Sequence, residues 1–121
     1  ETIEIGGDAV NGLYFTTHYD AGSPALTENA KLFVEAYTAK YGEAPGTFTA
    51  LGFDTYLVVR DAIERAGSTD REAIAKAVRQ TRDFPAVTGI ITIDENGDAI
   101  KSVAIVKIEN GKFVYDTTIN P

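Results

Sequence analysis

The sequence predicts a mixed α/β fold, with an early strand, about three helices and a C-terminal β meander. Between residues 23 and 82, apolar side chains recur at the three- and four-residue spacing of amphipathic helices. At residues 13–17, and again after Pro85, β-branched and aromatic residues gather in short runs bounded by turn-forming residues. A chain of 121 residues without repeats or low-complexity segments is long enough for one modest core.

The N-terminal segment contains one weak prediction and one strong one. Residues 2–10 are expected to form a short helix or a loop, because Gly6 and Gly7 weaken both assignments. Residues 13–17 read Leu-Tyr-Phe-Thr-Thr and predict a strand with turn residues on both sides. Because helices follow directly, this strand needs partners far along the chain or in another chain.

Two longer helices are expected next. The first opens at Ser23-Pro24, since Pro is tolerated in a first turn, and it ends before Gly42. Its apolar stripe consists of Ala30, Phe33, Val34, Tyr37 and Tyr41. The second helix runs from about Thr49 to Ala66, and Gly67 closes it. Its predicted inward face holds Leu51, Thr55, Val58, Val59, Ala62, Ile63 and Ala66.

A third helix and the β meander complete the predicted fold. The run Thr69-Asp70-Arg71-Glu72 has the pattern of a capping box and starts the helix. Its inward face is expected to hold Ala73, Ile74, Ala77 and Val78. Strands are predicted at residues 89–94 and 102–108, around a polar turn at residues 94–98. Asn110-Gly111 then forms a two-residue hairpin that leads into residues 113–115.

Composition and charge exclude several classes of protein. Eighteen acidic against eleven basic residues give a formal net charge of −7, so we expect no nucleic-acid partner. The absence of cysteine excludes disulfides, thiol catalysis and Cys-ligated zinc. No apolar run approaches the roughly 20 residues that span a bilayer. The chain lacks an initiator Met and a signal-peptide core, so we expect a mature or trimmed product, or part of a longer protein.

Residue spacing supports no catalytic or metal-binding motif. His18 is the only histidine, and the sequence has no Gly-x-Ser-x-Gly elbow, no dinucleotide-binding glycine pattern and no Walker lysine. Asp94, Asn96 and Asp98 mimic the first positions of a calcium loop, but Ala99 occupies the position that requires glycine. We therefore expect no enzyme activity, no catalytic residue, no metal and no cofactor.

The start of the second helix is the strongest candidate for a binding site. Residues 47–54 place two aromatic side chains and several hydroxyl groups there, and the amides of a helix N-terminus favour anionic ligand groups. Phe48 lies at or before the cap, where an aromatic side chain can point into a cleft. The alternative hypothesis is structural, with Phe48 stapling the helix entry and Phe53 in the core.

Several segments in succession carry a family resemblance. They are residues 12–19, 33–42, 50–54, 62–70 and 88–98, and together they resemble the periplasmic solute-binding proteins of branched-chain amino acid transporters. The resemblance implies a type I fold with two α/β lobes, of which residues 1–121 form the C-terminal third. It places hinge crossings near residues 17–20 and 102–104. Such a segment contains parts of both lobes, exposes apolar faces and is expected to self-associate.

The resemblance also implies a function, partners and a location. Members of this family capture a branched-chain or related amino acid between closing lobes and pass it to an ABC transporter permease, in the periplasm or outside the cell. Phe48 matches an aromatic that borders the side-chain pocket, and His18 and Tyr19 lie at a crossing. Thr49 and Phe53 neighbour the pocket position. Most head-group ligands of the family precede this segment, so the identity of the amino acid stays open.

Two alternatives remain open beside solute capture for transport. One is a ligand-sensing receptor or amide-responsive domain of the same fold. The other is a folding and oligomerising segment that has no ligand of its own.

Overall fold

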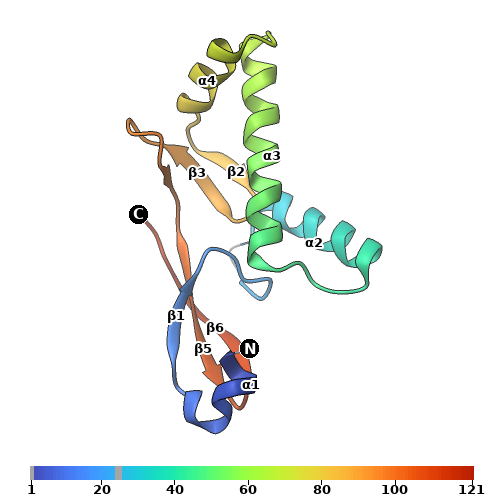
Figure 1. The fold of residues 1–121 in the computed structure, drawn as a ribbon, viewed down its shortest axis with the longest axis vertical. Coiled ribbons are helices and arrows are strands. Elements are labelled where there is room, and N and C mark those ends of the chain that lie inside the picture. The colour runs from blue at the N-terminus through green and yellow to red at the C-terminus, as the bar shows by residue number, and fades with distance from the viewer. Residues whose placement is uncertain (1, 24–25) are drawn as a thin grey trace.

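The computed structural model describes residues 2–23 and 26–121, which form an elongated α/β structure with two groups of elements along its long axis (Figure 1). The lower group contains α1 (Thr2–Gly6), the 3-10 turn η1 (Gly7–Val10), β1 (Tyr14–Thr17), β5 (Val103–Glu109) and β6 (Lys112–Ile119). The upper group contains α2 (Glu28–Tyr41), α3 (Thr47–Ala66), α4 (Arg71–Arg79), β2 (Phe84–Ala86), β3 (Gly89–Ile93) and β4 (Ala99–Ile100). The predicted α/β class is confirmed.

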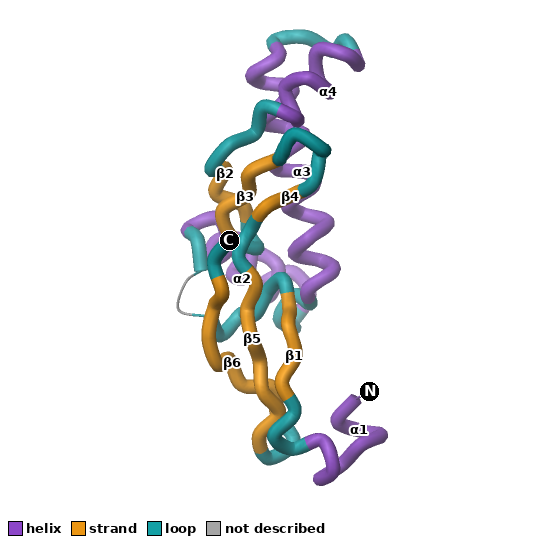
Figure 2. Tube along the Cα trace, turned by 90° about the vertical axis from the view of Figure 1, so that its left-hand side faces the viewer, coloured by secondary structure: helices purple, strands orange, loops and turns teal. Residues whose placement is uncertain are grey.

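The lower sheet joins the two ends of the chain. Its strand order is β1-β5-β6, and both pairs are antiparallel (Figure 2). Tyr14 lies opposite Lys107, so the early strand does find its partner far along the chain. Strand β5 alternates regularly, and its buried side chains are Ala104, Val106 and Ile108. A strand buried on one face in this way fixes its own register.

The C-terminal hairpin turns as predicted but is longer than expected. Asn110 and Gly111 have φ angles of 50° and 72°, the two positive values that a type I′ turn requires. Strand β6 extends over Lys112–Ile119 rather than residues 113–115, because it pairs with β5 from Lys112 to Ile119, with one irregularity at Asp116. The strands predicted at 89–94 and 102–108 are found at 89–93 and 103–109.

Two short strands of the upper sheet were not predicted. The upper sheet has the order β2-β3-β4, so β2 and β4 are both edge strands. Strand β2 has only three residues and contains Pro85, which an edge strand tolerates because it needs no amide donor there. Strand β4 has only two residues, Ala99 and Ile100, which is too short for an alternating pattern.

The helices begin at other residues than the sequence suggests. Helix α2 begins at Glu28 rather than near Ser23, and its N-cap is Thr27, while Pro24 lies outside the described residues. The Thr27 hydroxyl accepts a bond from the Ala30 amide (3.1 Å) and donates one to the carbonyl of Ala86 (2.6 Å). Ala86, in β2, is 59 residues from Thr27 in the sequence, so local sequence signals could not reveal this contact.

Helices α3 and α4 show the same kind of shift on a smaller scale. Helix α3 begins at Thr47 rather than Thr49. The N-cap of α4 is Asp70 rather than Thr69, since its carboxylate accepts from the Ala73 amide at 2.9 Å. The predicted ends at Gly42 and Gly67 are confirmed, and both glycines are left-handed.

The upper group contains two apolar clusters. The first lies between α2 and α3 and consists of Tyr19, Ala30, Phe33, Ala50 and Val87. The second lies between α3 and the upper sheet and consists of Val58, Ala86 and Ile91. The buried stripe of α3 therefore contains Ala50, Asp54, Val58 and Ala62, at four-residue spacing.

The predicted inward face of α3 is partly wrong. Val58 and Ala62 are buried, but Thr55 is exposed, and the residues Val59 and Ile63 are 39% and 40% exposed to solvent. The predicted face contained no charged residue, whereas a carboxylate, Asp54, occupies the middle of the buried stripe. One apolar side of α3 is consequently left open to solvent.

The chain passes twice between the two groups of elements. It leaves the lower sheet after Thr17 and returns from β4 to β5 through Lys101 and Ser102 (Figure 1). We call residues 18–20 the first crossing segment and residues 101–102 the second crossing segment. Val103 and Ala104 already pair within the lower sheet.

Candidate functional site

The first turn of α3 is held against the end of β1. The hydroxyl oxygens of Thr17 and Thr47 lie 3.2 Å apart, and the Thr17 hydroxyl also donates to the carbonyl of Tyr19 (3.1 Å). The N-cap residue Gly46 supplies no side-chain bond to the amides of this turn. Phe48, in the same turn, is 89% exposed. The fold therefore displays an aromatic side chain at a helix N-terminus next to the first crossing segment.

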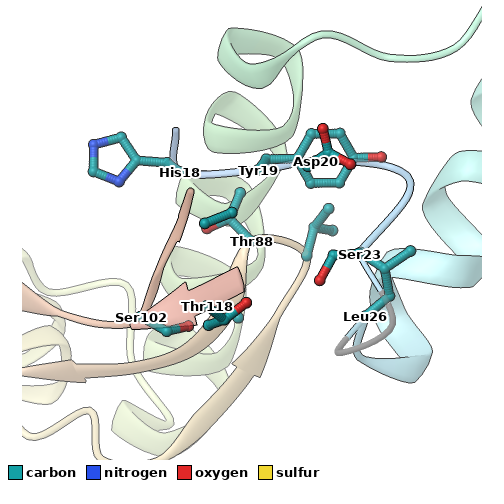
Figure 3. A pocket seen from close by; sticks show the side chains of 11 residues that line it. His18, Tyr19, Asp20, Ser23, Leu26, Thr88, Ser102 and Thr118 are labelled. Atoms are coloured by element: carbon teal, nitrogen blue, oxygen red, sulfur yellow. The ribbon is translucent and has the colours of Figure 1, made fainter. Parts of the chain in front are cut away.

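His18 and Tyr19 are neighbours in sequence but lie in different surroundings. The His18 side chain is exposed, and Figure 3 shows its imidazole pointing away from the other labelled side chains. Tyr19 is only 6% exposed and packs in the cluster between α2 and α3. Its hydroxyl is buried and has no hydrogen-bond partner among the described residues. Burial raises the pKa of this phenol, and the nearby Asp20 carboxylate adds to the rise.

A small cavity lies where the two crossing segments meet the turn between β2 and β3 (Figure 3). Its volume is about 40 Å³, and its walls include Tyr19, Thr88 and Ser102. A buried water needs only about 10–15 Å³ of such volume, so the cavity has room for a few waters and not for an amino acid.

Thr49 and Phe53 belong to a second feature, an open groove of about 620 Å³ between α2 and α3. Aromatic rings line it in close succession. The ring centroids of Phe33 and Phe53 are 4.7 Å apart, and those of Tyr37 and Tyr41 are 4.5 Å apart. Phe53 thus joins the two helices but remains 37% exposed, so the structural alternative that placed it in the core is wrong. The structure brings Thr49 and Phe53 together, but Phe48 does not line this groove.

A buried polar cluster beside the crossings was not predicted. Asp54 is 3% exposed, and its carboxylate accepts bonds from the Val87 amide (2.6 Å), the Thr88 amide (3.1 Å) and the Thr88 hydroxyl (2.5 Å). The ammonium of Lys101 donates to the Thr88 hydroxyl and, at 3.4 Å, to the carbonyl of His18. Burial lowers the pKa of Lys101, and the Asp54 charge opposes that shift.

One signal in the sequence could have revealed this cluster. Asp54 is four residues from both Ala50 and Val58, so a carboxylate stands in the middle of an apolar helical stripe. A charged residue at such a position is buried only with partners, which here come from the β2–β3 turn. Within residues 2–23 and 26–121, no group of three or more His, Cys, Asp or Glu side chains is arranged to hold a metal ion.

Comparison with known proteins identifies the family. The family model described as "Periplasmic binding protein" matches residues 1–112. The chain belongs to the periplasmic binding protein family. This family comprises the solute-binding proteins of transporters and is not an enzyme family. Among the described residues of this periplasmic binding protein, no helix combines the length and apolarity needed to cross a membrane.

Relatives of this periplasmic binding protein have names that refer to branched-chain amino acids. The Leu/Ile/Val-binding protein BraC3 of Rhizobium johnstonii is 35% identical over 112 residues, which are 91% of this chain and 29% of BraC3. The solved structure of the leucine-binding protein LivK of Thermotoga maritima is 56% identical and has a TM-score of 0.87. The match covers 98% of this chain and 34% of LivK.

A third match has its ligand in the solved structure. The substrate-binding protein LivJ of Streptococcus pneumoniae, in complex with isoleucine, is 27% identical with a TM-score of 0.81. The match covers 98% of this chain and 34% of LivJ. The chain therefore spans about a third of the length of these relatives. The predicted resemblance and the type I periplasmic-binding fold are confirmed.

Proposed function

We propose that this chain forms part of an extracytoplasmic solute-binding protein that captures a branched-chain or related amino acid for an ABC transporter. The names of the relatives support this assignment, since BraC3 is a Leu/Ile/Val-binding protein and LivK a leucine-binding protein. On this proposal the protein binds and releases its ligand without a chemical step, and a permease receives it.

In this proposal the hinge between two lobes lies near residues 17–20 and 102–104, and the two crossing segments form most of it. The upper and lower groups of elements then belong to different lobes. Two features support that arrangement. Each group has its own antiparallel sheet. The chain passes from one group to the other directly after Thr17 and again through Lys101 and Ser102. A ligand held between lobes is released when such connections bend.

The contact between Thr17 and Thr47 is the observation that carries the choice of ligand-binding residues. It brings the first turn of α3 to the first crossing segment, so that Phe48 stands exposed beside the proposed hinge. We assign Phe48 to the apolar wall of the pocket and His18 to the rim of the cleft. Tyr19 supports the crossing from behind, and Thr49 and Phe53 support the first turn of α3.

Calorimetric titration of the complete gene product that contains residues 1–121 tests this function. L-Leucine, L-isoleucine and L-valine are the ligands, and L-lysine is the control because an apolar pocket disfavours its charged side chain. Saturable 1:1 binding of at least one branched-chain amino acid is expected, with weaker or no binding of L-lysine. Absence of binding by all three branched-chain ligands would overturn the proposal.

A further inference from the structure

The cluster of Asp54, Thr88 and Lys101 connects four separate parts of the chain. Asp54 lies on α3, and Thr88 lies in the turn between β2 and β3. Lys101 lies in the second crossing segment and contacts the carbonyl of His18, which lies in the first. We call these three residues the Lys101 clamp. We propose that the Lys101 clamp fastens both crossing segments to α3 and thereby sets the resting position of the hinge.

The hydrogen bonds of the clamp form a consistent relay. A hydroxyl has one proton, and that of Thr88 is directed to the Asp54 carboxylate at 2.5 Å. Its lone pairs remain available to accept from the Lys101 ammonium, which is the contact observed. The Thr88 hydroxyl thus links a carboxylate to an ammonium group, and both ends are charged. Hydrogen bonds of this kind are about twice as strong as neutral ones.

The inner and outer parts of the clamp differ in burial. Asp54 and Thr88 are buried, and two backbone amides hold the carboxylate in addition to the hydroxyl. The contact from Lys101 to His18 is longer, at 3.4 Å, and is exposed. Water can replace the exposed contact between Lys101 and His18 at little cost, whereas loss of the Thr88 hydroxyl would leave the buried Asp54 carboxylate one hydrogen bond short. We therefore expect the inner part to persist and the His18 contact to change when the crossing segments bend.

Lys101 is accordingly a positioning residue that acts on ligand binding through the hinge and does not touch the ligand. This role rests on the proposed function, because it takes the two crossing segments as the hinge. The clamp itself can be tested without ligand. Its predicted signature is local protection of residues 18–20 and 101–103 from amide hydrogen exchange, since loss of a clamp loosens only what it holds.

The first experiment is hydrogen exchange with mass spectrometry on the ligand-free complete gene product, as wild type, Lys101→Met, Lys101→Arg and the control Lys76→Met. Lys76 lies on the exposed side of α4, so its substitution removes the same charge elsewhere. We expect Lys101→Met to accelerate exchange at residues 18–20 and 101–103 at least about tenfold, because it loses the contacts with Thr88 and His18 and one charged hydrogen bond alone accounts for about that factor. Lys101→Arg retains charge and donors and should keep most of the protection.

Other outcomes decide against the clamp. Unchanged exchange in Lys101→Met would overturn the proposal, because it would show that Lys101 does not hold the crossing segments. Acceleration that extends evenly over α4 and β6 would also overturn it, because it would show only a general loss of stability. If Lys101→Met does not fold, Thr88→Val takes its place, since it deletes the relay hydroxyl at nearly constant volume. The same local pattern is expected from it, and its absence would be equally decisive.

Titration of the same variants with L-leucine separates this proposal from the proposed function. If the wild type binds, Lys101→Met should change the dissociation constant several-fold, and Lys101→Arg should restore the wild-type value. An unchanged constant in Lys101→Met would overturn the link to the ligand site. If the wild type binds no branched-chain amino acid, the proposed function fails, while the exchange pattern still decides whether the clamp exists.

Discussion

The hydroxyl oxygens of Thr17 and Thr47 lie 3.2 Å apart although 30 residues separate them in the sequence. The contact joins the last residue of a strand in the lower sheet to the first residue of a helix in the upper group. The chain between them builds all of α2, so its length does not fix the distance. A polar pair at this place holds the entry of α3, and with it Phe48, beside the first crossing segment.

Substitution of Phe48 tests its assignment to the ligand pocket. Phe48→Ala should weaken binding of a branched-chain amino acid by about 1–3 kcal/mol, or roughly 5- to 150-fold, because the contact that the exposed ring would bury against the ligand is lost. Calorimetry on the complete gene product measures the change. Tyr56→Ala is the matched control, since Tyr56 is also an exposed aromatic residue on α3. Equal affinity of Phe48→Ala and wild type would remove Phe48 from the site.

The C-terminal hairpin depends on the conformation of Gly111. Gly111→Val should lower the free energy of unfolding by about 1–3 kcal/mol, because a β-branched residue at a φ of 72° is strained. An added Cβ would meet only Ile3, at 3.9 Å, so steric overlap does not explain the loss. Urea unfolding measures it. Gly111→Asn is the control and should lose less, since Asn tolerates left-handed φ. Equal loss in both variants would show that backbone conformation is not the cause.

Thr27 has two tasks at the start of α2, and its replacement should reveal both. Thr27→Val deletes the hydroxyl that caps the helix and that donates to the carbonyl of Ala86. We expect a loss of about 1–2 kcal/mol in the free energy of unfolding. The control is Thr38→Val, which makes the same exchange at an exposed position within α2. The prediction would be wrong if the urea midpoints of the two variants coincided.

The turn between β3 and β4 should make stability depend on pH. Backbone amides of Asp98 and Asn96 donate to the Asp94 carboxylate and lower the pKa of that group below its ordinary value of 3.8. A depressed pKa in the folded state means that the stabilisation is fully present above about pH 4 and is lost as the pH falls through the folded value. Asp94→Asn should therefore be less stable than wild type at pH 7, with a difference that shrinks in more acidic solution.

Urea unfolding of Asp94→Asn and wild type between pH 7 and pH 3 measures this dependence. Glu95→Gln serves as the control, because it removes a negative charge from the same turn but leaves the amide bonds of Asp94 in place. A difference between Asp94→Asn and wild type that stayed constant over the whole range would contradict the assignment.

Local chemistry is enough to predict much of the fold. Gly42 and Gly67 end their helices, and Asn110-Gly111 turns the hairpin, because each needs only a left-handed backbone that these residues adopt readily. Helix and strand periods likewise predict the middle helices and β5. The family resemblance explains why an isolated early strand precedes three helices.

The remaining features depend on residues far apart in the sequence. The position of the α2 N-cap depends on the hydrogen bond to the carbonyl of Ala86 as well as on the residues next to it in sequence. The burial of Asp54 depends on hydrogen bonds from the amides of Val87 and Thr88. Predictions from residue type placed apolar Ile63 inside and overlooked Asp54. From the sequence and its family resemblance, we predicted five residues for the candidate site. The sequence could not indicate that the Tyr19 side chain is buried in the core or that a lysine contacts both crossing segments.

The pairing of β1 with β5 has a consequence for the order in which the protein is made. Thr17 lies opposite Ala104, so β1 must wait for at least 87 further residues (104 − 17) before its partner in β5 exists. At translation rates of about 5–20 residues per second, that wait lasts roughly 4–17 seconds. Throughout it, the edge of β1 that later pairs with β5, including Tyr14 and Phe15, lacks this partner, and an unpaired strand edge is a surface on which aggregates form. The lower sheet is thus among the last parts of the chain that can fold.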